Sequence, residues 1–152
     1  MKRRHYLVLI AIGIVLFLAI SAALARVFSA DDAERAAITS LVQDEARGNA
    51  SGMIASITGC ASSATCRTRV QQNVAALTRR GAVSILQLNT STNFSLTSTL
   101  GTARVAWQTP LSLPIVQCVR VHRVGNALSG LRVELLEISL RIPSDSDCPP
   151  QY

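Results

Sequence analysis

Hydrophobic and polar positions follow three different patterns along this chain. Residues 6–25, YLVLIAIGIVLFLAISAALA, form one apolar run without a charge. Apolar residues then recur at helical spacing over residues 33–80, and mainly at every second position over residues 81–142. The pattern therefore predicts an apolar helix, then amphipathic helices, then an antiparallel sheet, which is an α+β layout.

The apolar run is about long enough to cross a bilayer as one helix, and it lacks the polar face of a surface helix. Lys2, Arg3 and Arg4 precede it and place the N-terminus in the cytoplasm. A cleaved signal peptide ending at Ala23–Ala25 is the alternative, although a signal peptide has an apolar stretch of only about 7–15 residues. We expect a single-pass signal anchor with the C-terminal domain outside, or a secreted domain if the segment is cleaved.

The pattern divides the chain into five parts. We expect a basic cytoplasmic flank, a transmembrane segment, a short polar spacer, an extracytoplasmic α+β domain and a tail. These parts comprise residues 1–5, 6–25, 26–32, 33–148 and 149–152.

Three helices are predicted in the first half of the domain. The first spans about residues 33–47, with Asp32 as its cap and an apolar stripe that contains Ile38, Leu41, Val42 and Ala46. The second is capped by Ser51 and ends before Gly59. The third covers about residues 64–80 and ends near Gly81.

Strands are predicted at residues 83–88, 93–97, 103–109, 115–124 and 131–142. In the last strand, LRVELLEISLRI, the apolar phase changes between Leu135 and Leu136. One extra residue at that point keeps both halves facing one core, which is the behaviour of a β-bulge. A bent strand allows the sheet to curve around the helices and leave a pocket.

The segment EARGNASGMIASI, residues 45–57, and the bent final hairpin resemble the nuclear transport factor 2-like superfamily, also called SnoaL-like or cystatin-like. The resemblance covers about residues 33–142 and implies helices packed on a curved, cone-shaped antiparallel sheet. An anchored member outside the membrane is also similar to inner-membrane subunits of type IV secretion machines and to actinobacterial membrane proteins associated with lipid importers. Enzymes of the superfamily use a pocket Asp, often with Tyr or His, and no Asp stands at a core-facing strand position here.

The charge pattern does not indicate nucleic-acid binding. Three of the 15 Lys and Arg residues precede the apolar run, and the other 12 are arginines that face nine acids. Lys2 is the only lysine, a bias typical of a GC-rich bacterial genome, so we expect a bacterial cytoplasmic membrane. Basic runs with interleaved aromatic residues are missing, and no nucleic-acid partner is expected.

All four cysteines follow the apolar run and so lie in an oxidising compartment, where an even number predicts disulfides. The Cys60-x5-Cys66 spacing is too long for a zinc knuckle or a C-x-x-C redox motif. We expect adjacent pairing, Cys60 with Cys66 and Cys118 with Cys148. The chain after Pro143 reaches about 20 Å, which is enough to return to the middle of the preceding strand.

The sequence offers few catalytic candidates. His122 has no partner nearby in sequence, and we expect a partly exposed strand residue. Glu134 and Glu137 are predicted to point away from the core. No motif for a metalloprotease, an α/β-hydrolase, a dinucleotide fold or a phosphate-binding loop is present. We therefore expect no cofactor, no metal site and no catalytic residue.

Three functions follow from these observations, in order of preference. The first is a non-catalytic interaction or assembly domain that binds other envelope proteins. The second is a module for a small apolar ligand in a cone-shaped pocket. The third, an isomerase- or dehydratase-like enzyme, needs a pocket carboxylate or histidine that the sequence does not place. The residues expected to line the pocket are Phe94, Trp107, Val133, Leu135 and Ile138.

Overall fold

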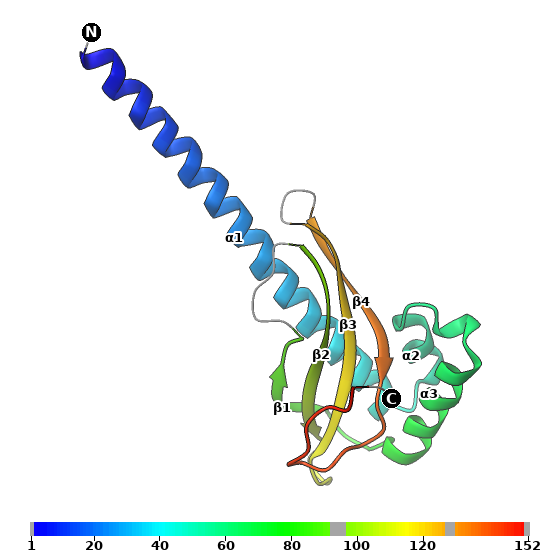
Figure 1. Cartoon of the computed structure of the whole chain (residues 1–152). Helices are drawn as coiled ribbons and strands as arrows, with labels where there is room; N and C mark the ends of the chain where they lie inside the picture. The colour runs from blue at the N-terminus through cyan, green and yellow to red at the C-terminus, as the bar shows by residue number, and fades with distance from the viewer. Residues whose placement is uncertain (1, 92–96, 127–129, 151–152) are drawn as a thin grey trace.

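The computed structural model describes residues 2–91, 97–126 and 130–150, and the described chain has the predicted α+β class. Its four described strands form one open antiparallel sheet in the order β1-β2-β3-β4 (Figure 1). The elements are α1 (Lys2–Ala46), α2 (Ala50–Ser56), the 3-10 turn η1 (Cys60–Ser62), α3 (Ala64–Leu77), β1 (Ser84–Asn89), β2 (Thr97–Gln108), β3 (Ile115–Asn126) and β4 (Gly130–Ile138).

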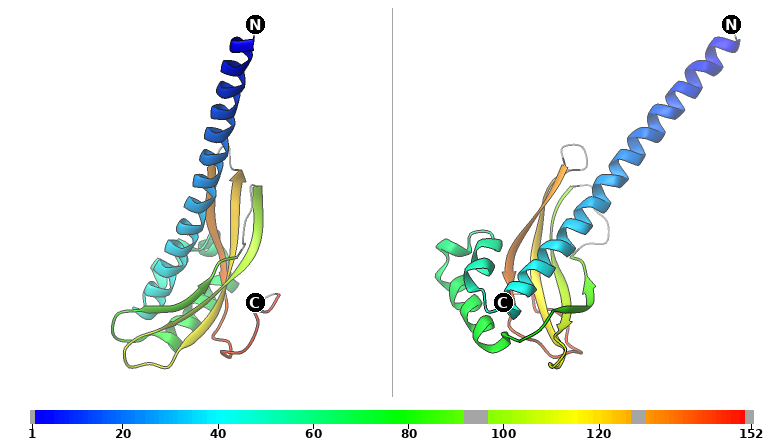
Figure 2. Two further views of the ribbon diagram at one scale, coloured as in Figure 1. Left: turned by 90° about the vertical axis from the view of Figure 1, so that its left-hand side faces the viewer. Right: turned by 180° about the vertical axis from the view of Figure 1, so that it is seen from behind.

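Helix α1 is unbroken from Lys2 to Ala46, so the predicted spacer at residues 26–32 is helical and Asp32 is not a cap. Residues 26–32, RVFSADD, contain neither Gly nor Pro, and nothing in them ends a helix that has already formed. The N-terminal half projects away from the sheet (Figure 2). It carries a window apolar and long enough to cross a membrane, and no part of that window is buried in the protein.

The C-terminal half of α1 crosses one face of the sheet and supplies much of the core. The stripe predicted there is buried: Ile38, Leu41 and Val42 are inaccessible to solvent, and Ala46 is nearly so. These side chains join one core cluster with sheet residues that include Trp107, Val119, Val121, Leu135 and Ile138.

Helices α2 and α3 lie beyond β4 at the distal part of the domain (Figure 1). The cap of α2 is Asn49 rather than Ser51, since the Asn49 side chain accepts a hydrogen bond from the Gly52 amide. Ser63 caps α3 in the same way. The turn between the helices contacts the sheet, where the Thr58 amide donates to the Leu135 carbonyl at 2.7 Å.

The bulge predicted in the last strand is confirmed. Arg120 pairs with Glu137 and the next residue, Val121, pairs with Leu135, which leaves Leu136 as the extra residue on β4. The strand ends at Ile138, earlier than predicted, and Leu140 is exposed instead of facing the core. After Ile138 the Ser139 amide still donates to the Cys118 carbonyl of β3 at 2.8 Å, and an isolated bridge then joins Ile142 to Val116.

Strands β1 and β3 match the predicted segments at residues 83–88 and 115–124 to within two residues. The predicted strand at residues 93–97 lies outside the described residues except for Thr97, where β2 begins. Strand β2, which spans Thr97–Gln108, begins six residues before the predicted segment at residues 103–109.

Both disulfides have the predicted pairing. The Cα atoms of Cys60 and Cys66 are 5.2 Å apart, and those of Cys118 and Cys148 are 5.7 Å apart. The first bond closes the bend from η1 to α3. The second fixes the C-terminal tail to the first part of β3, at Cys118.

Candidate functional site

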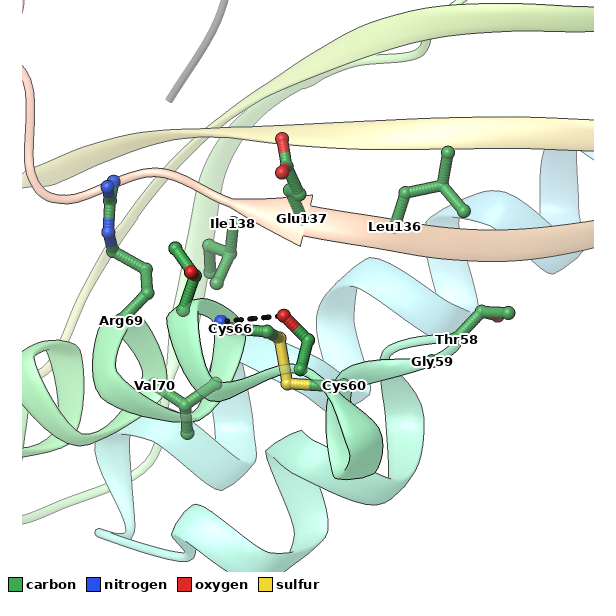
Figure 3. Close-up of a pocket in the computed structure, with 11 residues that line it drawn as sticks. Thr58, Gly59, Cys60, Cys66, Arg69, Val70, Leu136, Glu137 and Ile138 are labelled. Carbon is green, nitrogen blue, oxygen red and sulfur yellow. Dashed lines mark hydrogen bonds between the residues drawn. A yellow bond between two sulfur atoms is a disulfide. The ribbon is translucent and has the colours of Figure 1, made fainter.

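A groove of about 180 Å³ lies between β4 and the disulfide-linked turn that leads into α3. Cys60, Cys66 and Arg69 form one side, and Glu137 and Ile138 form the other (Figure 3). Of the predicted pocket-lining residues that the structure describes, Ile138 alone borders this groove. The groove is small, and its walls mix apolar and charged groups.

Three other predicted lining residues, Trp107, Val133 and Leu135, do not border this groove. Trp107 and Leu135 are buried in the core, and Val133 packs against the core. Phe94 lies outside the described residues. The sequence placed these side chains on one face of the sheet, but that face is occupied by α1.

Two buried polar clusters hold α1 against the sheet. The first, which we name the distal clamp, consists of Glu45, Trp107 and Gln117. The indole Nε1 of Trp107 donates to Gln117 Oε1 at 2.8 Å, and Gln117 Nε2 donates to Glu45 Oε1 at 2.8 Å. Gln117 Nε2 also lies 3.2 Å from the carbonyl oxygen of Ser139, so the distal clamp joins α1, β2 and β3 to the segment after β4.

The Glu45 carboxyl group has no charged partner in this cluster. It is inaccessible to solvent, and Oε2 accepts no hydrogen bond from any described residue. Burial raises the pKa of Glu45 from 4.5 to about 7, although the hydrogen bond from Gln117 lowers it in part. Glu45 is therefore a core carboxyl group that changes charge near neutral pH.

The second cluster, the proximal clamp, lies closer to the apolar run and consists of Asp31, Glu34 and Arg123. Arg123 on β3 donates through Nε to Glu34 Oε2 at 2.8 Å, and its Nη2 pairs with both Asp31 and Glu34. The Ser91 amide donates to the other Glu34 oxygen at 2.7 Å. Burial acts to lower the pKa of Arg123, but the hydrogen bonds with Asp31 and Glu34 outweigh that effect and raise it. The buried charge is therefore compensated.

The two clamps lie on one face of α1 and enclose its apolar stripe. Glu34 and Glu45 are separated by about 16 Å along a helix, and their partners Arg123 and Gln117 by about 20 Å along a strand. Because these lengths are similar, both contacts can form at once. The earlier residue of α1 binds the later residue of β3, so the two elements run antiparallel.

Sequence reasoning missed both clamps, although the signal was present. Glu34 and Glu45 extend the apolar stripe at helical spacing from Ile38. Gln117 and Arg123 continue the inward alternation of β3 in the same way. Each clamp position was therefore recognisable in the sequence as a polar residue at a position where the periodicity predicts a buried side chain.

The residues predicted to be peripheral are on the surface. His122 and Glu134 are partly exposed, and their side chains approach to 3.6 Å across β3 and β4. Arg120 and Glu137 form a second cross-strand pair at 3.2 Å. Among the described residues, no group of three or more His, Cys, Asp or Glu side chains is arranged to hold a metal ion.

Comparison with protein-family models, with curated proteins and with solved structures yields no match to this chain. The clamps and the groove are thus interpreted from their own geometry.

Proposed function

We propose that this protein is a membrane-anchored, non-catalytic interaction or assembly domain of the bacterial envelope. One observation carries the proposal: α1 continues without a break from the apolar run into the core, where both clamps bind it. A helix held at two points cannot swivel freely against the sheet. The domain would therefore be presented at a fixed height and orientation above the membrane.

The position outside the membrane is supported by independent features. Lys2, Arg3 and Arg4 favour a cytoplasmic N-terminus, and two disulfides fit an oxidising compartment. The uncharged run at residues 6–25 is longer than the apolar stretch of about 7–15 residues in a signal peptide, which favours a retained anchor. A secreted form remains the alternative, because cleavage after Ala25 leaves both clamps intact.

A binding role is better supported than catalysis. The buried carboxyl groups of Glu34 and Glu45 both face the helix–sheet junction, and neither borders the groove beside Ile138. The carboxylate that does border it, Glu137, is partly exposed and pairs with Arg120 at 3.2 Å.

We also propose that the sheet, the bulge and the helices belong to a cone-shaped fold of the nuclear transport factor 2-like kind. The apolar-ligand alternative has less support, since Trp107 and Leu135 are used in core packing.

The test is a photo-crosslinking scan of the full-length chain in its native membrane. A photoreactive amino acid would replace exposed residues one at a time, for example Leu86 on β1, Leu100 on β2, Leu111 in the β2–β3 turn and Gln72 on α3. At least one position should give an adduct with a different envelope protein, and the adduct should weaken when residues 6–25 are removed. If every adduct is with lipid or with the same chain, the proposal is wrong.

A further inference from the structure

The connection between β2 and β3 lies at the end of the molecule opposite the start of α1 (Figures 1 and 2). It carries two exposed leucines, Leu111 and Leu113. Leu111 is 96% exposed and Leu113 is 77% exposed, more than any other large apolar side chain that the structure describes. Isolated surface leucines are ordinary, but two beside each other at a tip form an apolar patch. We name residues 109–114, TPLSLP, the distal tip.

The distal tip is built to hold these leucines outward. The Ser112 amide donates to the Thr109 carbonyl at 3.0 Å, which closes a β-turn with Pro110 at its second position. The Ser112 hydroxyl accepts a hydrogen bond from the Thr109 amide at 2.9 Å, so this side chain points inward between the two leucines. Pro110 and Pro114 limit the backbone further. Little conformational entropy is left for the tip to lose on binding.

The surroundings of the tip add an apolar recess and positive charge. A hollow of about 550 Å³ is lined by Leu113, Pro114, Ile142 and Pro143 together with Arg141. Arg141 is exposed, and its guanidinium lies 3.4 Å from the Pro114 carbonyl. On the other side Pro110 approaches Gly81, so the exposed Arg80 is close by. Asp145 follows Ser144, which also lines the hollow, and adds one acidic residue to this part of the tail.

From this arrangement we propose that the distal tip is the docking surface for a second envelope protein with an apolar cleft and carboxylate groups at its rim. This inference rests on the proposed interaction function and names its surface. The anchoring bilayer is a poor occupant, because about 30 Å of α1 separates the apolar run from the end of the helix. A second copy is also a poor occupant, because two protruding tips cannot enclose each other and both are flanked by arginine.

The experiment places a photo-crosslinking amino acid at Leu111 in the full-length, membrane-inserted chain. We expect an adduct with one other envelope protein, mapped by mass spectrometry to a segment with exposed Asp or Glu residues. Arg141→Glu should reduce the adduct about tenfold. Replacing a mapped carboxylate of the partner with Lys should restore it. The matched control is the same substitution at Leu100, which is 63% exposed on β2 and should not give this adduct.

Several outcomes overturn the inference. These are an adduct of Leu111 with the same chain or with lipid, an adduct unaffected by Arg141→Glu, and the absence of any adduct at this position. Adducts at Leu86, Leu100 or Gln72 without one at Leu111 reject the distal tip but keep the interaction function, whereas no protein adduct at any of the four positions rejects both. Leu113→Ser should weaken the Leu111 adduct about tenfold without changing the thermal midpoint, which separates lost docking from lost folding.

Discussion

Glu45 and Arg123 are both ionisable groups in the core, but their surroundings differ. Arg123 faces two carboxylates and remains charged. Glu45 faces the neutral amide of Gln117 and loses its charge when it is protonated. Their contributions to stability therefore depend on pH in different ways.

We expect Glu45→Gln to remove a pH dependence of stability. The pKa in the folded state, about 7, is above the ordinary 4.5, so the folded protein binds this proton more tightly. The stability associated with the neutral group is complete below about pH 4.5 and is lost as the pH rises through 7. The cost of the charge at high pH is about 3 kcal/mol.

The variant should therefore match the wild type near about pH 4 and be up to about 3 kcal/mol more stable near about pH 9. Pulse proteolysis of the full chain in detergent and urea measures this difference. A wild type that gains stability relative to the variant between these pH values would contradict the assignment.

Removing Arg123 should be costly. Arg123→Met leaves Glu34 buried and uncompensated, and such a loss typically costs about 3–5 kcal/mol. The double variant Arg123→Met, Glu34→Met should recover most of it, because both fully buried charges are then absent and the remaining carboxylate, Asp31, is partly exposed to solvent. The control is Arg132→Met, which alters an exposed arginine on β4 and should change unfolding by less than about 0.5 kcal/mol. Equal losses in the single and double variants would show that the pair is not the cause.

The clamp residues show which buried side chains could not be predicted from sequence periodicity. Periodicity placed Ile38, Leu41 and Val42 in the core correctly, because burial of an apolar stripe needs no particular partner. Burial of Glu34 needs Arg123, which is 89 residues further along the chain. The sequence pattern therefore indicates that position 34 faces the core, but it does not identify the distant partner that compensates the buried charge of Glu34.

At the scale of elements, local rules predicted α3, β1, β3 and the bulge to within a few residues, but they missed the start of β2 and the early end of β4. The phase change at Leu135–Leu136 was sufficient for the bulge, since period two is strict in a strand. The continuity of α1 was missed because Asp31 and Asp32 are typical of a helix start. In the structure Asp31 instead pairs with Arg123, and the helix passes through.

The two disulfides should contribute unequally to stability. Their sequence separations are 6 and 30 residues, and the chain-entropy relation gives about 2 and about 4 kcal/mol. Replacing Cys118 and Cys148 with Ala should therefore lower stability more than replacing Cys60 and Cys66. Urea unfolding of both double variants measures the order, and the reverse order would contradict this prediction.

At the scale of the whole molecule, the domain should fold without the apolar run, because both clamps lie beyond it. Residues 29–152 keep Asp31 and Glu34 and should give a folded, soluble protein. Residues 36–152 lose both partners of Arg123 and should be less stable by about 3–5 kcal/mol. Circular dichroism and thermal unfolding compare the two chains, and equal stability would show that the proximal clamp is dispensable.

The order and type of the elements were more predictable than the way in which they pack against one another in the core. Composition and periodicity were enough for an apolar helix followed by an α+β domain. They could not show that α1 itself fills the face where Trp107 and Leu135 were expected to line a pocket. That outcome depends on where a helix docks, which many distant contacts decide together.

The extra residue on β4 has a consequence for self-association. Open sheets present unpaired edge strands, and a long regular edge recruits strands from other copies. Here both edge strands are irregular. Leu136 is the extra residue on β4, and Leu86 is the extra residue on β1, because Ile85 and Gln87 pair with the adjacent residues Trp107 and Ala106 of β2. The amide of Thr58 also occupies the Leu135 carbonyl on the open side of β4. The same bulge that bends the sheet thus protects copies of this protein from polymerising edge to edge.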